Sequence, residues 1–133
     1  MKHPPTVYPV LWYRDAPSAM AWLKEAFGFE EMVVIPGENG TIVHAEMSFG
    51  EGVIMLGSAR LESGWASPLD LPAVCQSIYM VVPDPDAHYE RAKAAGAEIT
   101  IGLETTDYGS RQYSAKDPEG HHWHFGTYQP SAQ

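Results

Sequence analysis

Cysteine is almost absent from this chain of 133 residues, which contains a single one, Cys75. One cysteine excludes an internal disulfide framework and favours a reducing compartment, so we expect a cytoplasmic protein. The residues before Pro5 also lack the apolar core of a signal peptide. No segment approaches the roughly 20 consecutive apolar residues of a membrane-spanning helix, and we therefore expect no membrane partner.

Basic residues are scarce as well. Eight Lys and Arg stand against 17 Asp and Glu, which gives a formal net charge of −9. Proteins that bind nucleic acids need a basic surface, so the charge argues against a nucleic-acid partner. An acidic surface is compatible with a cationic small molecule. The chain also has no glycine-rich phosphate loop, because the cluster Gly37-Glu38-Asn39-Gly40 is typical of a hairpin turn.

What the chain does contain is an internal repeat. Asp15 opens the first copy and Asp84 opens the second, and each copy continues with a helical stretch, a glycine, a polar loop and a hairpin. A unit of roughly 60 residues is too small to bury a large core alone, so two copies are expected to pack together. We predict one domain, with a first module over residues 5–57, a linker over 58–74 and a second module over 75–128.

Local signals define the elements of each copy. Asp15 is a suitable N-cap with Pro17 in the first turn, and Gly28 ends that helix. Apolar, β-rich stretches predict strands over residues 7–13, 29–35, 41–49, 52–56, 77–82, 98–102, 110–116 and 121–127. The predicted fold class is therefore α+β. Two βαβββ modules would form curved mixed sheets around a ligand groove, with the helices outside.

Alternation along the strands predicts which side chains face the helices and which face the groove. The helix-facing residues are expected to be Leu11, Tyr13, Val43, Ala45, Met47, Ile78, Met80, Val82, Trp123 and Phe125. The intervening residues would line the groove: Tyr8, Val10, Trp12, His44, Glu46, Val53, Met55, Ser77, Tyr79, His122 and His124. A bulge would shift such an assignment by one residue.

The paired modules contain Tyr108-Gly109-Ser110-Arg111, then Asp117-Pro118-Glu119-Gly120, then His124-Phe125. In this arrangement the chain resembles the vicinal oxygen chelate superfamily, and within it the bleomycin-resistance-like branch. That superfamily includes glyoxalase I, extradiol dioxygenases, fosfomycin-resistance transferases and bleomycin-binding proteins. The resemblance covers nearly the whole chain, and it implies the paired-module fold and a homodimer whose second chain completes the groove.

The resemblance also implies where a metal would lie. Enzymes of this superfamily hold a divalent ion with side chains that correspond here to Tyr8, Met55, Ser77 and His124. Only His124 is an ordinary ligand, because a divalent ion at a catalytic site needs several imidazoles or carboxylates. We therefore expect no cofactor and no catalytic residue, and we favour a binding protein over an enzyme.

A displaced metal site is the alternative. His122 and His124 share a strand face, and His44 and Glu46 would complete a set of four ligands for a divalent metal. With such a site the protein would be a metal-dependent lyase, isomerase or dioxygenase. Otherwise these histidines form a polar groove wall that contacts a ligand.

Glu46 is expected to need a partner, because burying an unpaired carboxylate costs several kcal/mol. Arg111, a histidine or a ligand amine could fill that role. The aromatic residues Tyr8, Trp12, Trp65 and Tyr79, with Met55, suit a planar guest, although aromatic side chains also serve as plain core packing.

The sequence therefore predicts a metal-independent binding protein for a small aromatic or peptide-like molecule, and in the most specific version an antibiotic of the bleomycin type. A metabolic or biosynthetic carrier is a third interpretation. The predicted ligand-binding residues are Tyr8, Trp12, His44, Glu46, Met55, Trp65, Tyr79, Arg111, His122 and His124.

Overall fold

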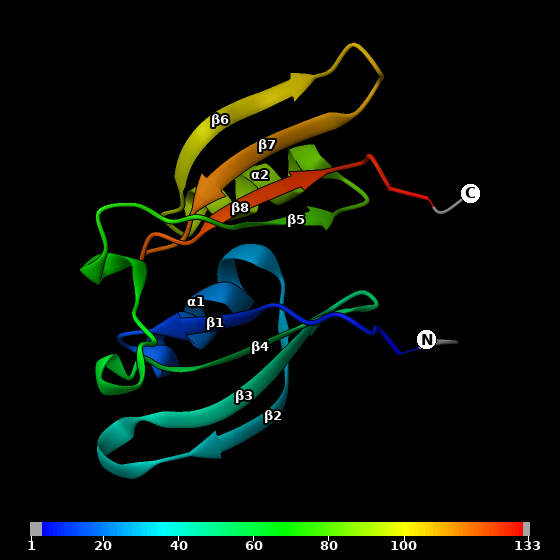
Figure 1. The fold of residues 1–133 in the computed structure, drawn as a ribbon. Helices are drawn as coiled ribbons and strands as arrows, with labels where there is room; N and C mark the ends of the chain where they lie inside the picture. Colours follow the sequence, from blue (N-terminus) through cyan, green and yellow to red (C-terminus); the bar gives the residue numbers. More distant parts are fainter. Residues whose placement is uncertain (1–3, 132–133) are drawn as a thin grey trace.

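A computed structural model of the chain describes residues 4–131 (Figure 1). The first half contains β1 (Val10–Tyr13), α1 (Ala16–Phe27), β2 (Glu30–Pro36), β3 (Ile42–Phe49) and β4 (Gly52–Ser58). The second half repeats this order with β5 (Ser77–Val81), α2 (Pro85–Ala94), β6 (Glu98–Thr105), β7 (Arg111–Lys116) and β8 (His122–Gly126). The predicted α+β fold of two βαβββ units is confirmed. Neither helix is long and apolar enough to cross a membrane, as far as residues 4–131 are concerned.

Each half forms a mixed sheet of four strands with the same topology. The strand orders are β1-β4-β3-β2 and β5-β8-β7-β6, and in each sheet the first pair is parallel and the others are antiparallel. The register of the parallel pair is repeated as well. Val10 of β1 pairs with Met55 of β4, and at the equivalent place Tyr79 of β5 pairs with His124 of β8. Figure 1 shows the two sheets one above the other, with both helices behind them and both termini on one side.

The helices begin where the sequence predicts. The Asp15 side chain accepts a hydrogen bond from the backbone N–H of Ser18, and Asp84 does the same for Ala87. Helix α1 ends at Gly28, whose φ of 87° is left-handed and therefore favours glycine. Each of these features lies within a few residues of the helix end that it marks.

The two modules share one aromatic core. Phe27, at the end of α1, lies with its ring centroid 4.7 Å from Phe125 and 5.3 Å from Trp123, both on β8. His88 of α2 donates through Nε2 to the Phe27 carbonyl at 2.9 Å and accepts at Nδ1 from the Tyr113 hydroxyl. Burial lowers the pKa of His88, so its neutral form joins the two modules at neutral pH.

The predicted strand facings hold for the innermost residues, with one exception in β3, and one strand boundary differs. Val43 was expected against the helices, but it is 48% exposed while Ile42 is buried, because β2 and β3 change register between Ile35 and Pro36. The first strand also starts later than predicted. Its first three predicted residues, 7–9, lie outside β1, although the Pro9 carbonyl still accepts from the Met55 N–H at 2.9 Å.

Candidate functional site

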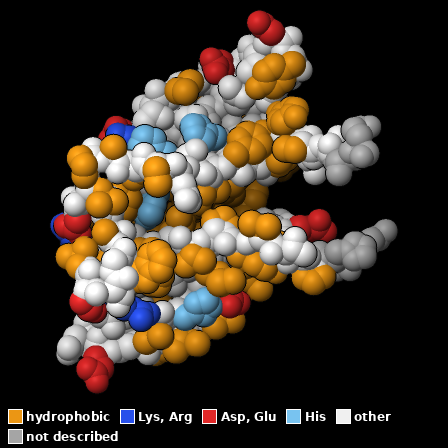
Figure 2. Space-filling model, viewed as in Figure 1, with side chains coloured by type: hydrophobic (Ala, Val, Ile, Leu, Met, Phe, Trp, Pro, Cys, Tyr) orange, Lys and Arg blue, Asp and Glu red, His pale blue; other side chains and the backbone are white. Residues whose placement is uncertain are grey.

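The sheet faces turned away from the helices form the candidate site. Figure 2 shows this side of the molecule, with hydrophobic and histidine side chains over both halves and a hollow between the halves beside the termini. Alternation along the strands places the predicted groove residues of β1, β3, β4, β5 and β8 here, whereas Tyr8 precedes β1, Trp65 lies in the linker and Arg111 faces elsewhere. At the linker end the halves are tied together, because His121 Nε2 donates to the Trp12 carbonyl at 3.0 Å.

Two tryptophans stack on the first half of the groove. The rings of Trp12, on β1, and Trp65, in the linker, have centroids 5.2 Å apart and planes inclined by 21°. The Arg60 guanidinium lies 5.6 Å from the Trp12 ring centroid, as in a cation–π contact. Arg60 and Trp65 also pair through their backbones as an isolated bridge. Trp65 remains 50% exposed, so the stack is accessible from solvent.

A glycine lets this stack reach the polar part of the groove. Gly57 is the strand partner of Trp12, and a Cβ atom at Gly57 would meet the Trp12 ring at 3.1 Å. The Trp12 ring therefore covers a position of β4 that carries no side chain. On the neighbouring strand, His44 Nε2 lies 2.8 Å from Glu46 Oε2, and both side chains are about one-third exposed.

Arg111 lies elsewhere. It shares a face of β7 with the buried Tyr113 and Ala115, which is the helix side, and its guanidinium donates twice to Asp86 of α2 at 3.0 Å. These hydrogen bonds raise the pKa of Arg111 and lower that of Asp86. The prediction that Arg111 lines the groove beside Glu46 is wrong, because the strand phase of β7 directs it to the opposite face. The partner of Glu46 is His44.

On the second half, His124 is held by two serines. Its Nε2 lies 3.1 Å from Ser77 Oγ and its Nδ1 lies 2.6 Å from Ser114 Oγ. Burial and, to a smaller extent, the nearby His122 lower the pKa of His124. Both ring nitrogens are therefore engaged, and the ring has a defined orientation.

A tyrosine cluster lies farther along the second sheet. Tyr79 donates its hydroxyl to the Tyr128 carbonyl at 2.6 Å, and the rings of Tyr108 and Tyr128 meet edge-on at 5.8 Å. All three tyrosines are more than one-third exposed. The sequence analysis predicted Tyr79 but not Tyr108 or Tyr128. These two lie in loops after β6 and β8, where there is no strand alternation to predict which way a side chain points.

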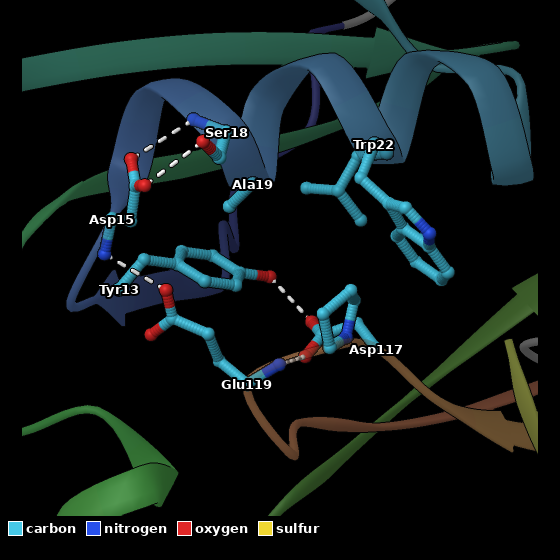
Figure 3. A pocket seen from close by; sticks show the side chains of 9 residues that line it. Tyr13, Asp15, Ser18, Ala19, Trp22, Asp117 and Glu119 are labelled. Carbon is cyan, nitrogen blue, oxygen red and sulfur yellow. Dashed lines mark hydrogen bonds between the residues drawn. The ribbon is translucent and has the colours of Figure 1, made fainter. Parts of the chain in front are cut away.

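A second cavity, of about 190 Å³, lies on the helix side between β1, α1 and the turn after β7 (Figure 3). There the Tyr13 hydroxyl donates to Asp117 at 2.7 Å, and Glu119 accepts from the backbone N–H of Asp15 at 2.8 Å and from the Ser67 hydroxyl at 2.6 Å. Burial and the adjacent Asp117 raise the pKa of Tyr13 well above its ordinary value. Both carboxylates have their hydrogen bonds satisfied within the chain, so they join the modules and leave the groove to other residues.

The alternative metal set is not assembled. Within the described part of the chain, no three His, Cys, Asp or Glu side chains gather so that they could hold a metal ion. His44 and Glu46 form one pair on the first sheet, while His122 and His124 lie on the second. The four side chains therefore lie in two separate pairs, one on each sheet.

The repeated fold agrees with comparisons against known proteins. The family model described as Glyoxalase/Bleomycin resistance protein/Dioxygenase superfamily matches residues 6–125. The chain belongs to this superfamily. An uncharacterised protein of Mycobacterium bovis is 33% identical to it over 125 residues, which cover 92% of this chain and 82% of that protein.

Solved structures of the superfamily fold are similar as well. TioX from Micromonospora sp. ML1 is 31% identical, with a TM-score of 0.75 and coverage of 97% of this chain and 100% of TioX. The fosfomycin resistance protein FosX of Listeria monocytogenes, complexed with Mn(II) and sulfate, is 16% identical, with a TM-score of 0.70 and coverage of 94% and 93%. At that identity FosX shows the shared fold alone.

The resemblance implies Tyr8, Met55, Ser77 and His124 as the positions where superfamily enzymes hold metal. In the second half, Ser77 and His124 are in contact. In the first half, Met55 holds the place on β4 that His124 holds on β8. A phenol, a thioether, a hydroxyl and one imidazole do not fit a divalent ion such as Mn²⁺, which prefers carboxylates and imidazoles.

Proposed function

We propose that this protein binds a small aromatic or peptide-like molecule without a metal ion, in its most specific version an antibiotic of the bleomycin type. The observation that carries the proposal is the half-exposed Trp12–Trp65 stack on the groove face. Tryptophan pairs with one accessible face are suited to planar guests. Membership of a superfamily whose proteins bind small molecules supports the same function.

The carboxylate near the stack, rather than the ring face that Arg60 already covers, favours a cationic guest. Arg60 already occupies a cation–π position over Trp12 and donates to the Val43 carbonyl at 3.2 Å. The residue after Val43 is His44, whose partner Glu46 supplies a carboxylate on the same face. A planar cation would meet aromatic rings and a carboxylate in one region, and the net charge of −9 would favour its approach.

The test titrates bleomycin and the planar cation proflavine against tryptophan fluorescence. We expect the guests to quench the fluorescence of the wild type, and most of this quenching to be lost in Trp65→Ala. The Trp65 side chain is half-exposed, so its removal should not leave a large cavity. Glu46→Gln should weaken binding by roughly 10- to 150-fold, since a charge-assisted hydrogen bond contributes about 1.5–3 kcal/mol. The matched control is Glu51→Gln, which makes the same replacement at an exposed residue of the turn between β3 and β4. This variant should bind the guests as the wild type does.

Two results would contradict the proposal. Equal binding of the cations to wild type and Glu46→Gln would limit Glu46 to its structural pair with His44. Absence of binding by every aromatic guest would leave the tryptophans as packing alone. The titration is repeated after metal ions are removed with a chelator and again after Mn²⁺ is added. If the guest binds only when the metal is present, the proposed metal-independent binding is wrong.

We also propose that the protein acts as a homodimer, as superfamily proteins often do. All residues of β2 are exposed, including the consecutive Met32, Val33, Val34 and Ile35. An exposed apolar edge strand invites pairing with another chain, most simply through a two-fold interface. We expect sedimentation to show a dimer at high micromolar concentration and Val34→Lys to shift it toward the monomer. A wild-type monomer under those conditions would refute the dimer.

A further inference from the structure

A separate cavity of about 380 Å³ lies at the linker end of the groove. One wall consists of linker residues between Pro68 and Val74, which are mostly apolar. The other wall comes from the hairpin of β7 and β8 and includes Lys116, Gly120 and His122. This volume exceeds that of an inorganic ion, since a water molecule occupies about 30 Å³ in the liquid. The cavity therefore has room for a small organic molecule.

The apolar wall is held firmly in place. Gly120 has a φ of 95°, and a Cβ atom there would lie 3.3 Å from the Cβ of Pro68. Glycine thus allows the linker to approach the hairpin closely. The preceding residue of the linker, Ser67, is fully buried and donates its hydroxyl to Glu119 at 2.6 Å. The linker is consequently fixed to the second sheet on one side of the cavity.

The polar wall carries positive charge. Lys116 and His122 are directly opposite each other on the antiparallel strands β7 and β8, so their side chains share a face. The Lys116 side chain is 35% exposed, and its Nζ lies 3.7 Å from a carboxylate oxygen of Glu98, whose side chain is itself 70% exposed. A pair of this kind contributes little stability and leaves Lys116 available.

We propose that this cavity binds the carboxylate end of a small apolar organic acid. Lys116 supplies the charge, an N–H of His122 donates a hydrogen bond, and the proline- and leucine-containing wall contacts the apolar body. The site goes beyond the proposed aromatic-cation function, because it does not use Glu46 or the Trp12–Trp65 stack.

The test compares N-acetyl-leucine with N-acetyl-leucinamide, which has the same body and no charge. Binding is measured by calorimetry and by shifts of backbone amide NMR signals. We expect the acid to bind and to move the signals of residues 68–74 and 116–122. The amide should bind at least roughly tenfold more weakly, because it lacks the charge-assisted contact. Lys116→Met should weaken binding of the acid by a similar factor, whereas Lys93→Met, on the outer helix α2, should not change it.

His122→Asn is the second variant and keeps the proposal testable if Lys116→Met folds poorly. Equal binding of acid and amide would overturn the proposal, and so would equal effects of Lys116→Met and Lys93→Met. Inorganic phosphate that displaces the acid at equal concentration would show a site for any oxyanion and refute an organic-acid site. Quenching by proflavine should be the same in Lys116→Met as in the wild type. The two proposals can therefore fail separately, because proflavine reports on the Trp12–Trp65 stack and N-acetyl-leucine on the cavity beside Lys116.

Discussion

Replacing Asp117 by alanine is expected to lower the free energy of unfolding by roughly 3–5 kcal/mol, because several buried donors lose their acceptor at once. The carboxylate is 4% exposed and accepts from the Tyr13 hydroxyl at 2.7 Å and from Trp123 Nε1 at 3.1 Å. It also accepts from the backbone N–H groups of Glu119 and His121, each at 3.1 Å. Denaturation in urea, followed by tryptophan fluorescence and circular dichroism, measures the loss.

Two further variants separate this network from a general effect of charge. Asp117→Asn keeps the oxygen that serves the two backbone groups but places an amide NH₂ opposite the Trp123 N–H, so its loss should be intermediate. Asp107→Ala removes an exposed loop carboxylate and should leave stability nearly unchanged. If Asp117→Ala costs no more than Asp107→Ala, the network does not hold the modules together.

Replacing Phe27 by alanine should be comparably destabilising, by roughly 3–5 kcal/mol, which is typical of a large buried aromatic side chain. Phe27 is fully buried and lies among rings from the second module, namely His88, Trp123 and Phe125. Because the cavity would open between the modules, we expect both to lose stability together. Chemical denaturation should therefore show one transition with a lower midpoint.

The control for this substitution is Phe27→Leu, which keeps much of the volume and should lose less stability than the alanine variant. Tryptophan fluorescence and far-ultraviolet circular dichroism should give the same midpoint in both variants. Two separated transitions would show that the modules fold independently, and would contradict the prediction of one domain with a shared core.

Much of this arrangement could be predicted from the sequence because its causes are local. Asp15 and Gly28 bound α1 through contacts within a few residues. Period-two alternation predicted the buried faces at Tyr13 and Trp123 and the groove position of His124. Alternation also predicted that Trp12 would face the groove, and Trp65 was predicted to line it because its aromatic side chain suits a planar guest. Neither argument could show that the two rings stack.

What the sequence determined by itself was the element order, the helix ends and most strand facings, since these depend on capping and on a repeat of two residues. The tertiary structure decided the partners. Arg111 binds Asp86 and not Glu46, because the strand phase of β7 turns it to the helix side, and the register shift beside β3 exposes Val43. The pairing of Asp117 with Tyr13, and the cavity beside Lys116, join segments far apart in the chain. Such contacts depend on how the modules and the linker pack together, which no local pattern encodes.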